Sequence, residues 1–320
     1  MGSKVVILWV IILIIAASAI PAQQAITGRP IKLIGGDGLF FMHPVFSPDG
    51  SKIAFTTSNY QGLWIMNADG SDAREISNEP AAGYGFEWSS DSKAIASRVA
   101  RFEGRYRFNA IKVFDLENND SRFVTNFRTM MPGLPHWGAW DEKIYLYGRG
   151  KIEVFDSGKK VSALPKKSTP VIDCFLKDDQ IAIGNPAAKD YKIYEPVKGE
   201  RCINLVLSPD RSRVAFEIIG GNMYVMNVDG RGLVDLGRGH RPQWAPDNLH
   251  LVYMVTTDDG YKYLSSDIYT IKIDGSGRTK LEFAEDKLEM NPCWSPDGKK
   301  IVFDAFDEGA IYLIELMNEN

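Results

Sequence analysis

The sequence predicts an all-β fold, a seven-bladed β-propeller, from a repeated turn, the period of its repeats and the lack of helical patterning. The segment FSPDGSKIAF (46–55) returns near the far end of the chain as WSPDGKKIVF (294–303). Related segments recur between them with an average spacing of about 41 residues, which is typical of four-stranded propeller blades. After residue 25 no long run shows the 3.6-residue apolar period of a helix.

Seven segments carry the repeat, and each opens with a residue that is followed seven positions later by Ile, Val or Leu. The pattern is clear in five segments and degenerate in the two that open at Trp137 and Cys174. Seven four-stranded antiparallel blades are therefore predicted, with a six-bladed ring as the alternative. The opening residues are Phe46, Trp88, Trp137, Cys174, Leu207, Trp244 and Trp294.

The segment Ser47-Pro48-Asp49-Gly50 predicts a tight turn between the first and second strands of a blade. Pro presets φ, Ser and Asp side chains can bond nearby backbone N–H groups, and Gly adopts the left-handed conformation that other residues resist. The IAF segment that follows is apolar on both faces, as expected of a strand covered on both sides by neighbouring blades. A structural role in these turns is assigned to Asp49, Asp91, Asp210, Asp247 and Asp297.

The second half of the unit also repeats, as LWIMNADG (63–70), MYVMNVDG (223–230) and IYTIKIDG (268–275). These segments predict a third strand and an Asp-Gly turn into an outer fourth strand. The fourth strands are expected at REIS (74–77), LVDL (233–236) and TKLEF (279–283). Longer loops are expected at 98–109 and 256–267.

Closure of the ring is predicted from the two ends of the repeat region. The last unit stops after three strands, whereas the segment RPIKLIGG (29–36) precedes the first unit and resembles a fourth strand. We expect 29–36 to complete the final blade, because an open ring would leave two sheet edges unpaired. The alternative is a linker. One propeller domain is predicted over 29–317.

Residues 1–25 are predicted to be a signal peptide. Lys4 is followed by an apolar stretch, 5–20, and then by small residues. The alternative is an uncleaved membrane anchor, although the stretch is short against the ~20 residues of a spanning helix. A periplasmic or secreted protein is expected, with membrane contact only through an uncleaved leader.

Cys174, Cys202 and Cys293 fit neither a disulfide framework nor metal-ligand spacing. A net charge of -4 without basic runs argues against nucleic acid as a partner.

The motifs HPVFSPDG (43–50), PQWAPD (242–247) and PCWSPDG (292–298) resemble the repeat of the TolB-like β-propeller family. The likeness covers about 29–317 and implies the fold, while saying little about the task. TolB proteins have six blades and an additional N-terminal α/β domain, for which this sequence leaves only about ten residues between leader and first strand. The resemblance therefore implies a TolB-like propeller without that domain. Related propellers form the body of oligogalacturonate lyases.

Polar residues just before the opening residues form the candidate site, because those positions lie where the innermost strand of a propeller begins. A ligand-binding funnel is predicted there, with no catalytic residue, no metal ligand and no cofactor assigned. Its candidate residues are His43, Glu87, His136, Asp173, Asn204, His240, Arg241, Gln243 and Asn291.

The preferred function is a non-catalytic, monomeric binding module for a protein partner or small ligand. Tyrosines in the links between strands are candidates for a partner surface, because exposed Tyr is favoured at interfaces. They are Tyr60, Tyr84, Tyr106, Tyr261 and Tyr263. The alternative is a carbohydrate-active lyase or hydrolase, in which His43, His136 and His240 would bind a metal in the funnel.

Overall fold

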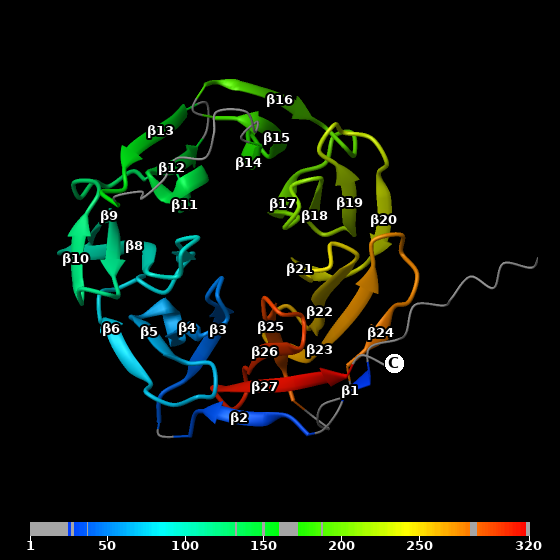
Figure 1. Ribbon diagram of the computed structural model, residues 1–320, viewed down its shortest axis with the longest axis horizontal. Coiled ribbons are helices and arrows are strands. Elements are labelled where there is room, and N and C mark those ends of the chain that lie inside the picture. The colour runs from blue at the N-terminus through cyan, green and yellow to red at the C-terminus, as the bar shows by residue number, and fades with distance from the viewer. Residues whose placement is uncertain are drawn as a thin grey trace, which may run out of the picture.

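The computed structural model describes residues 25–26, 29–36, 38–131, 133–148, 151–159, 172–186, 188–281 and 287–317. In this part of the chain, seven antiparallel sheets are arranged as blades around a central axis (Figure 1). The all-β, seven-bladed prediction is confirmed, and the six-bladed alternative is wrong. Apart from Ala25, the predicted leader lies outside the described residues. Within them, the helical elements are the short η1 (Ser58–Tyr60) and η2 (Ala139–Asp141), and none is long and apolar enough to span a membrane.

The first four blades follow the chain order, with the innermost strand first. Blade 1 contains β3 (Phe41–Phe46), β4 (Lys52–Thr57), β5 (Leu63–Asn67) and β6 (Arg74–Ser77). Blade 2 contains β7 (Glu87–Trp88), β8 (Ala94–Glu103), β9 (Tyr106–Asp115) and β10 (Asp120–Phe123). The described strands of blade 3 are β11 (Pro135–Trp137), β12 (Lys143–Gly148) and β13 (Lys151–Asp156). Those of blade 4 are β14 (Asp173–Lys177), β15 (Gln180–Asn185) and β16 (Asp190–Tyr194).

The remaining blades continue around the ring. Blade 5 contains β17 (Cys202–Leu207), β18 (Arg213–Ile218), β19 (Met223–Asn227) and β20 (Val234–Gly237). Blade 6 contains β21 (His240–Trp244), β22 (His250–Asp258), β23 (Tyr263–Lys272) and β24 (Thr279–Lys280). Blade 7 contains β25 (Glu289–Trp294), β26 (Lys300–Ala305) and β27 (Ala310–Met317), joined by β2 (Ile31–Ile34) and β1 (Ala25–Ile26) from the other end of the chain. The outer strands predicted near 74–77, 233–236 and 279–283 are thus β6, β20 and β24.

The core lies between blades, which explains why the repeat strands are apolar on both faces. One cluster joins Ala54, Leu63 and Ile65 of blade 1 to Trp88 and Ile95 of blade 2. Three of the four opening tryptophans also bond across the blade boundary, each donating from Nε1 to a backbone carbonyl of the preceding blade. The pairs are Trp88 with Val45 (3.2 Å), Trp137 with Glu87 (2.9 Å) and Trp244 with Val206 (3.1 Å).

The strand register follows the repeat in six blades, where the opening residue lies opposite the apolar residue seven positions later. Trp88 faces Ile95, for example, and Trp294 faces Ile301. Blade 4 differs, because Cys174 faces Ile183 and the residue opposite Ile181 is Leu176. The opening position assigned to Cys174 was therefore wrong by two residues. A tight turn at residues 178–179 replaces the longer Ser-Pro-Asp-Gly turn there, which shortens the hairpin.

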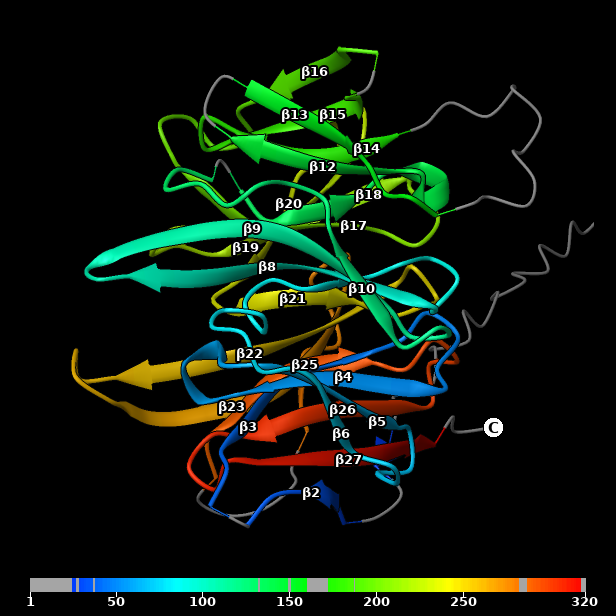
Figure 2. The same ribbon diagram turned by 90° about the vertical axis from the view of Figure 1, so that its left-hand side faces the viewer.

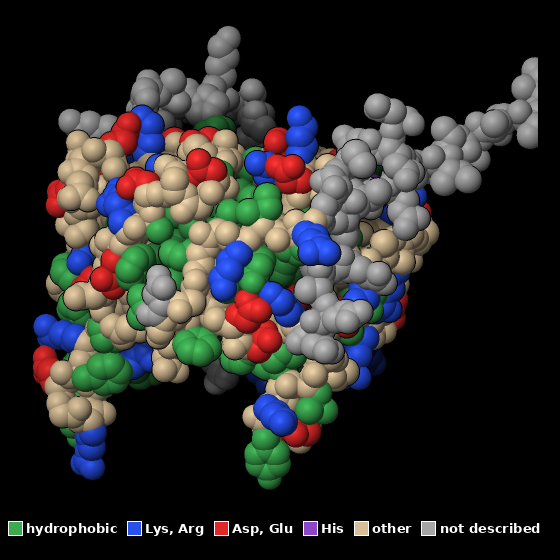
Figure 3. Space-filling view, turned by 90° about the horizontal axis from the view of Figure 1, so that it is seen from below, with side chains coloured by type: hydrophobic (Ala, Val, Ile, Leu, Met, Phe, Trp, Pro, Cys, Tyr) green, Lys and Arg blue, Asp and Glu red, His purple; other side chains and the backbone are tan. Residues whose placement is uncertain are grey.

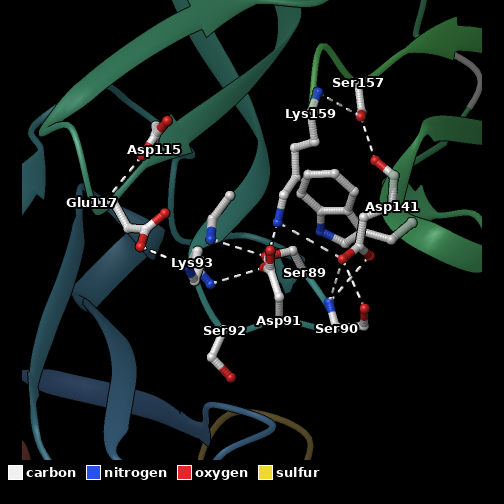
Figure 4. A network of polar contacts seen from close by, with 12 residues as sticks. Ser89, Ser90, Asp91, Ser92, Lys93, Asp115, Glu117, Asp141, Ser157 and Lys159 are labelled. Carbon is white, nitrogen blue, oxygen red and sulfur yellow. Dashed lines mark hydrogen bonds and ion pairs between the residues drawn. The ribbon is translucent and has the colours of Figure 1, made fainter. Parts of the chain in front are cut away.

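The turn between the first and second strands carries the same hydrogen bond in several blades. Figure 4 shows this turn in blade 2, where the Ser89 hydroxyl donates to Asp91 Oδ1 at 2.7 Å. The Ser90 N–H and hydroxyl extend the network to blade 3, since both donate to Asp141 Oδ2, at 2.9 and 2.8 Å. The same bond recurs in the pairs Ser47–Asp49, Ser208–Asp210 and Ser295–Asp297. These bonds agree with the structural role assigned to the repeated aspartates.

The ring closes as predicted, because β2 pairs antiparallel with β27 and completes the last blade. Ile31 lies opposite Leu313, and Leu33 and Ile34 pack against the core shared by blades 7 and 1. β1 adds a second pairing to the same strand, in which Ile26 lies opposite Leu316. The first and last copies of the repeated turn are neighbours in space: a Cβ on Gly50 would lie 3.3 Å from Pro296 Cδ.

The loops expected at 98–109 and 256–267 are instead extensions of two hairpins, so that expectation was wrong. We call the β8–β9 hairpin (94–115) finger 1 and the β22–β23 hairpin (250–272) finger 2. Finger 1 pairs without interruption up to Glu103 opposite Tyr106, around a Gly104-Arg105 turn. Figure 2 shows both fingers projecting from the same side of the ring, and Figure 3 shows their ends standing clear of the body.

Candidate functional site

The ring has two unlike faces. The face that carries the Ser-Pro-Asp-Gly turns is called the turn face. On the opposite face, called the hairpin face, the innermost strands begin and the second strand of each blade turns back into the third. The fingers belong to the hairpin face (Figure 2).

All nine candidate residues lie on innermost strands, as predicted from the sequence. They are His43 on β3, Glu87 on β7, His136 on β11, Asp173 on β14, Asn204 on β17, His240, Arg241 and Gln243 on β21, and Asn291 on β25.

Four candidates occupy the same unusual backbone position, three residues before the opening residue of blades 1, 5, 6 and 7. Each has a positive φ and lies within a register shift of the innermost strand, which marks a β-bulge. The residues and their φ values are His43 (58°), Asn204 (50°), Arg241 (54°) and Asn291 (51°). A non-glycine residue in this region is strained and persists only where its surroundings hold it.

Asp304 of β26 holds two of these bulges together across the closing boundary of the ring. Its Oδ1 accepts the backbone N–H of His43 and the side-chain N–H of Asn291, both at 2.9 Å. The carboxyl is fully buried, and its Oδ2 has no hydrogen-bond partner among the described residues. Burial raises the pKa of Asp304 to about 7, even though these donors and Arg241 favour its charged form.

Glu217 of β18 occupies the equivalent position in blade 5 and forms the equivalent bridge. Its Oε1 accepts the Asn204 side-chain N–H at 2.8 Å and also the backbone N–H of Arg241. Its Oε2 lies 3.3 Å from His240 Nδ1. Each bridge therefore ties an asparagine of one blade to the bulge of the next blade through a buried carboxyl group.

The Arg241 side chain joins the two bridges into one network. Its Nη1 donates to Asn291 Oδ1 at 3.0 Å and lies 3.2 Å from His43 Nδ1, which fits a neutral imidazole accepting the bond. Burial, together with the adjacent Arg241 charge, lowers the pKa of His43 to about 4, so the ring is neutral at physiological pH. This network, which we call cluster A, connects blades 5, 6, 7 and 1.

A second network, cluster B, is centred on His136 and connects blades 2, 3 and 4. His136 Nδ1 lies 3.1 Å from Glu87 Oε2, and His136 Nε2 lies 3.0 Å from Asp173 Oδ1. Tyr147 of β12 donates its hydroxyl to Asp173 Oδ2 at 2.9 Å. Burial alone would lower the pKa of His136, but the two carboxylates outweigh it and hold that pKa well above its usual value. The pKa of Asp173 is lowered, because hydrogen bonds from His136 and Tyr147 outweigh its burial.

The chemistry of these clusters is that of internally paired groups. His43 belongs to cluster A and His136 to cluster B, so the three histidines of the lyase alternative do not form one ligand set. In cluster B, the carboxylates bind opposite ring nitrogens of His136. Within the described residues, no group of three or more His, Cys, Asp or Glu side chains could hold a metal ion. Gln243 joins neither cluster, since no hydrogen bond links its side chain to another described residue.

Three members of the clusters were missed from the sequence: Glu217, Asp304 and Tyr147. All three lie ten residues after the opening residue of their unit, near the end of the second strand. For Glu217 and Asp304, the signal was an acidic residue directly after an apolar run of the repeat strand, VAFE in blade 5 and IVFD in blade 7. It could have been found by comparing this position between units.

The hairpin face also carries exposed aromatic side chains at the ends of the fingers. Tyr106 on finger 1 is 58% exposed, and Tyr261 at the turn of finger 2 is 99% exposed. A cleft of about 620 Å³ lies between the end of finger 2 and the β26–β27 turn. In its wall, the rings of Tyr263 and Phe306 meet edge to face with centroids 6.0 Å apart. Three of the five tyrosines proposed for a partner surface thus lie on the two fingers.

Among curated proteins, the chain resembles Tol-Pal system protein TolB from Anaeromyxobacter dehalogenans. It is 44% identical to TolB of strain 2CP-C over 63 residues, which is 19% of this chain and 13% of that protein. It is 50% identical to TolB of strain 2CP-1 over 46 residues, 14% of this chain and 11% of that protein. The matches therefore span only a small part of either relative. No known family profile matches the chain.

Solved structures of the same fold cover nearly the whole chain at low identity. An oligogalacturonate lyase in complex with manganese aligns over 93% of this chain and 97% of its own, with a TM-score of 0.53 and 12% identity. A chain of the mitotic checkpoint complex aligns over 100% and 99%, with a TM-score of 0.60 and 14% identity. At these identities the likeness shows the fold alone. The seven-bladed ring and the repeat matches together define a TolB-like β-propeller.

Proposed function

We propose that this chain is an exported, non-catalytic binding module that presents its hairpin face to a protein partner. The observation that carries the proposal is the pair of fingers, which project from one face and bear exposed aromatic side chains. An apolar side chain at the end of a projecting hairpin gains nothing within its own fold. In an interface, Tyr and Phe contribute large contact area at a small cost in side-chain entropy.

The clusters at the axis support a binding role over a catalytic one. Their carboxyl, imidazole and amide groups bond mainly to one another, across blade boundaries and onto strained bulges. A side chain in such a bond must break it before it can bind a substrate or a metal. The clusters thus fit a role in fixing the starts of the innermost strands, which leaves recognition to the finger ends and the cleft beside finger 2.

Export rests on the apolar segment 5–20 behind Lys4. Cell fractionation of the natural host tests this directly. We expect the protein in the periplasmic or secreted fraction, and in the membrane fraction only if the leader is retained. Recovery in the cytoplasmic fraction would contradict export.

Affinity measurements on finger variants test the binding role. A tagged full-length chain is used to capture a partner from the same cells, and the purified partner is then titrated with the parent and with the variant Tyr106→Ser/Tyr261→Ser. We expect the affinity to fall about tenfold or more, as for loss of interface aromatic side chains. The control is Ile193→Ser, which removes an exposed apolar side chain from β16, away from the fingers. Equal affinities of all three proteins would overturn the proposal.

A further inference from the structure

A cavity of about 550 Å³ lies at the base of finger 1, and it shares no lining residue with cluster A or cluster B. Its wall combines Arg98 and Arg107 from blade 2, Arg128 from the link that follows blade 2, and Lys151 and Glu153 from β13 of blade 3. The volume is within the range of small-molecule binding sites in proteins, about 300–1,000 Å³.

The cavity is strongly cationic. Four of its lining residues are basic and one is acidic, which gives a net charge of +3 from the described residues. Glu153 is already engaged by two of them, since its Oε2 accepts from Arg128 Nη2 at 2.5 Å and its Oε1 lies 2.9 Å from Lys151 Nζ. No carboxylate among the described residues pairs with Arg98 or Arg107.

The guanidinium groups in this wall retain unused hydrogen-bonding capacity. Arg98 Nε and Arg128 Nε are both buried and have no hydrogen-bond partner among the described residues. Buried polar atoms in proteins nearly always have a partner, so such an atom needs an explanation. Burial and the neighbouring Arg107 charge lower the pKa of Arg98, which agrees with cations held close together without a counter-charge. The Arg98 guanidinium group packs over the Tyr84 ring, with its Cζ atom 5.3 Å from the ring centroid.

We propose that this cavity binds a phosphate group, either as the free ion or at the end of a small phosphorylated molecule. A doubly charged oxyanion would offset most of the net charge and accept bonds from several N–H donors at once. Guanidinium groups suit this task, because their planar forks match phosphate oxygens. Met130 and Met131 add an apolar wall that could contact the organic part of such a molecule.

The test is calorimetric titration of the full-length protein with inorganic phosphate, glycerol phosphate and acetate at low ionic strength. We expect phosphate to bind and acetate to bind at least about tenfold more weakly, because it offers one charge and two oxygens. Tighter binding of glycerol phosphate than of inorganic phosphate would identify a phosphorylated molecule as the ligand, and the reverse order would identify the free ion. Absence of binding by both phosphates would overturn the proposal.

Two variants and one control locate the site. Arg98→Gln and Arg107→Gln should each weaken phosphate binding about tenfold, by removing a charged donor from the wall. The control Arg101→Gln removes the same charge from the same hairpin but outside the cavity, where Arg101 pairs with Glu103 at 3.1 Å and packs on Phe127. It should change the affinity less than about twofold. An equal loss in all three variants would show a general effect of charge and contradict the site.

Folding is checked from melting temperatures, and Arg107→Gln keeps the test valid if the half-buried Arg98 proves necessary for folding. The cavity lining does not include Tyr106 or Tyr261. Phosphate binding and partner binding are therefore tested with different variants, and failure of one test does not decide the other.

Discussion

The turn face and the hairpin face of the ring are built from the same repeat, but they differ in how similar their turns and strand ends are from blade to blade. On the turn face, the Ser–Asp hydrogen bond returns in blades 1, 2, 5 and 7 with nearly constant length, 2.5 to 2.7 Å. On the hairpin face, the strand ends differ in length from blade to blade, and among the described residues the fingers extend from blades 2 and 6 alone. The repeated face specifies the fold, whereas the face that varies carries the features expected of a binding surface.

The largest effect is expected from removing the strand that closes the ring. Deletion of residues 25–36 removes β1 and β2, exposes the edge of β27 and uncovers the core under Leu33 and Ile34. We expect the melting temperature to fall by about 10 °C or more, as for a loss of several kcal/mol in a chain of this size. Thermal unfolding followed by circular dichroism measures this. An unchanged melting curve would show that closure of the ring by β1 and β2 contributes nothing to its stability.

Two aspartates, one near each face, should respond to pH in opposite directions. The folded-state pKa of Asp304 is raised to about 7, so the folded protein holds a proton that the unfolded chain releases, and stability falls as the pH rises toward 7. Asp304→Asn removes this cost and keeps an acceptor for His43 and Asn291. We expect it to stabilise the protein on the order of 2 kcal/mol at about pH 8 and hardly at all at about pH 4.

Asp297 on the turn face provides the contrast. The Ser295 hydroxyl lowers its pKa, so its contribution to stability is present above the ordinary carboxyl pKa and is lost as the pH falls through the lower folded value. Asp297→Asn should therefore destabilise the protein at neutral pH and approach the parent in acid. Denaturant unfolding of the parent and both variants between about pH 4 and about pH 8 measures how each variant's change in the free energy of unfolding depends on pH. A pH dependence of the same sign for both variants would contradict the assignment of the two environments.

A smaller loss of stability is expected from two glycine substitutions, which distinguish the cost of backbone strain from the cost of contact between blades. Gly50 and Gly104 both have a positive φ, 73° and 60°, but only Gly50 has a neighbour, Pro296 of the adjacent turn. Gly104→Ala at the end of finger 1 should cost about 1 kcal/mol for the left-handed conformation alone. Gly50→Ala should cost about 2 kcal/mol, because its Cβ also presses on Pro296. Equal losses of stability in the two variants would show that the contact between Gly50 and Pro296 of the neighbouring turn does not affect the free energy of unfolding.

The smallest effect on stability is expected at the finger ends. Tyr106→Ser/Tyr261→Ser removes side chains that are largely exposed, so the free energy of unfolding should change by about 0.5 kcal/mol or less. Urea unfolding of the variant and the parent measures this change. A loss of several kcal/mol would show that these rings stabilise the fold, and it would remove the reason to regard them as a partner surface.

The sequence predicted the fold well because the fold is encoded in its repeats. The opening tryptophans, the Ser-Pro-Asp-Gly turns and the segment 29–36 each appear in the structure in their expected roles. Blade 4 was misaligned because its hairpin lacks that turn. Residues seven positions apart, such as Cys174 and Ile181, therefore do not lie opposite each other there. The sequence predicts loops at the finger ends because Gly and charged residues surround their turns, although the alternation in RFEGRYRF continues the strands.

The candidate site could be predicted only in part. The repeat places His43, Asn204, Arg241 and Asn291 at one position of the innermost strand, and that position holds in the structure. Which residues bond across blades depends on side chains from the neighbouring unit, such as Asp304 with His43, that lie 261 residues apart in the chain. The cationic cavity had no sequence signal, since Arg98, Arg128 and Lys151 come from three separate segments.

Photo-crosslinking in living cells tests most directly the claim that the hairpin face binds a partner. A photoreactive phenylalanine analogue replaces Tyr106, Tyr261 or, on the turn face, the exposed Ala73 of the β5–β6 link, each in the full-length chain. We predict one common protein adduct from the two finger positions and none from Ala73. Adducts from Ala73 alone, or equally from both faces, would contradict it.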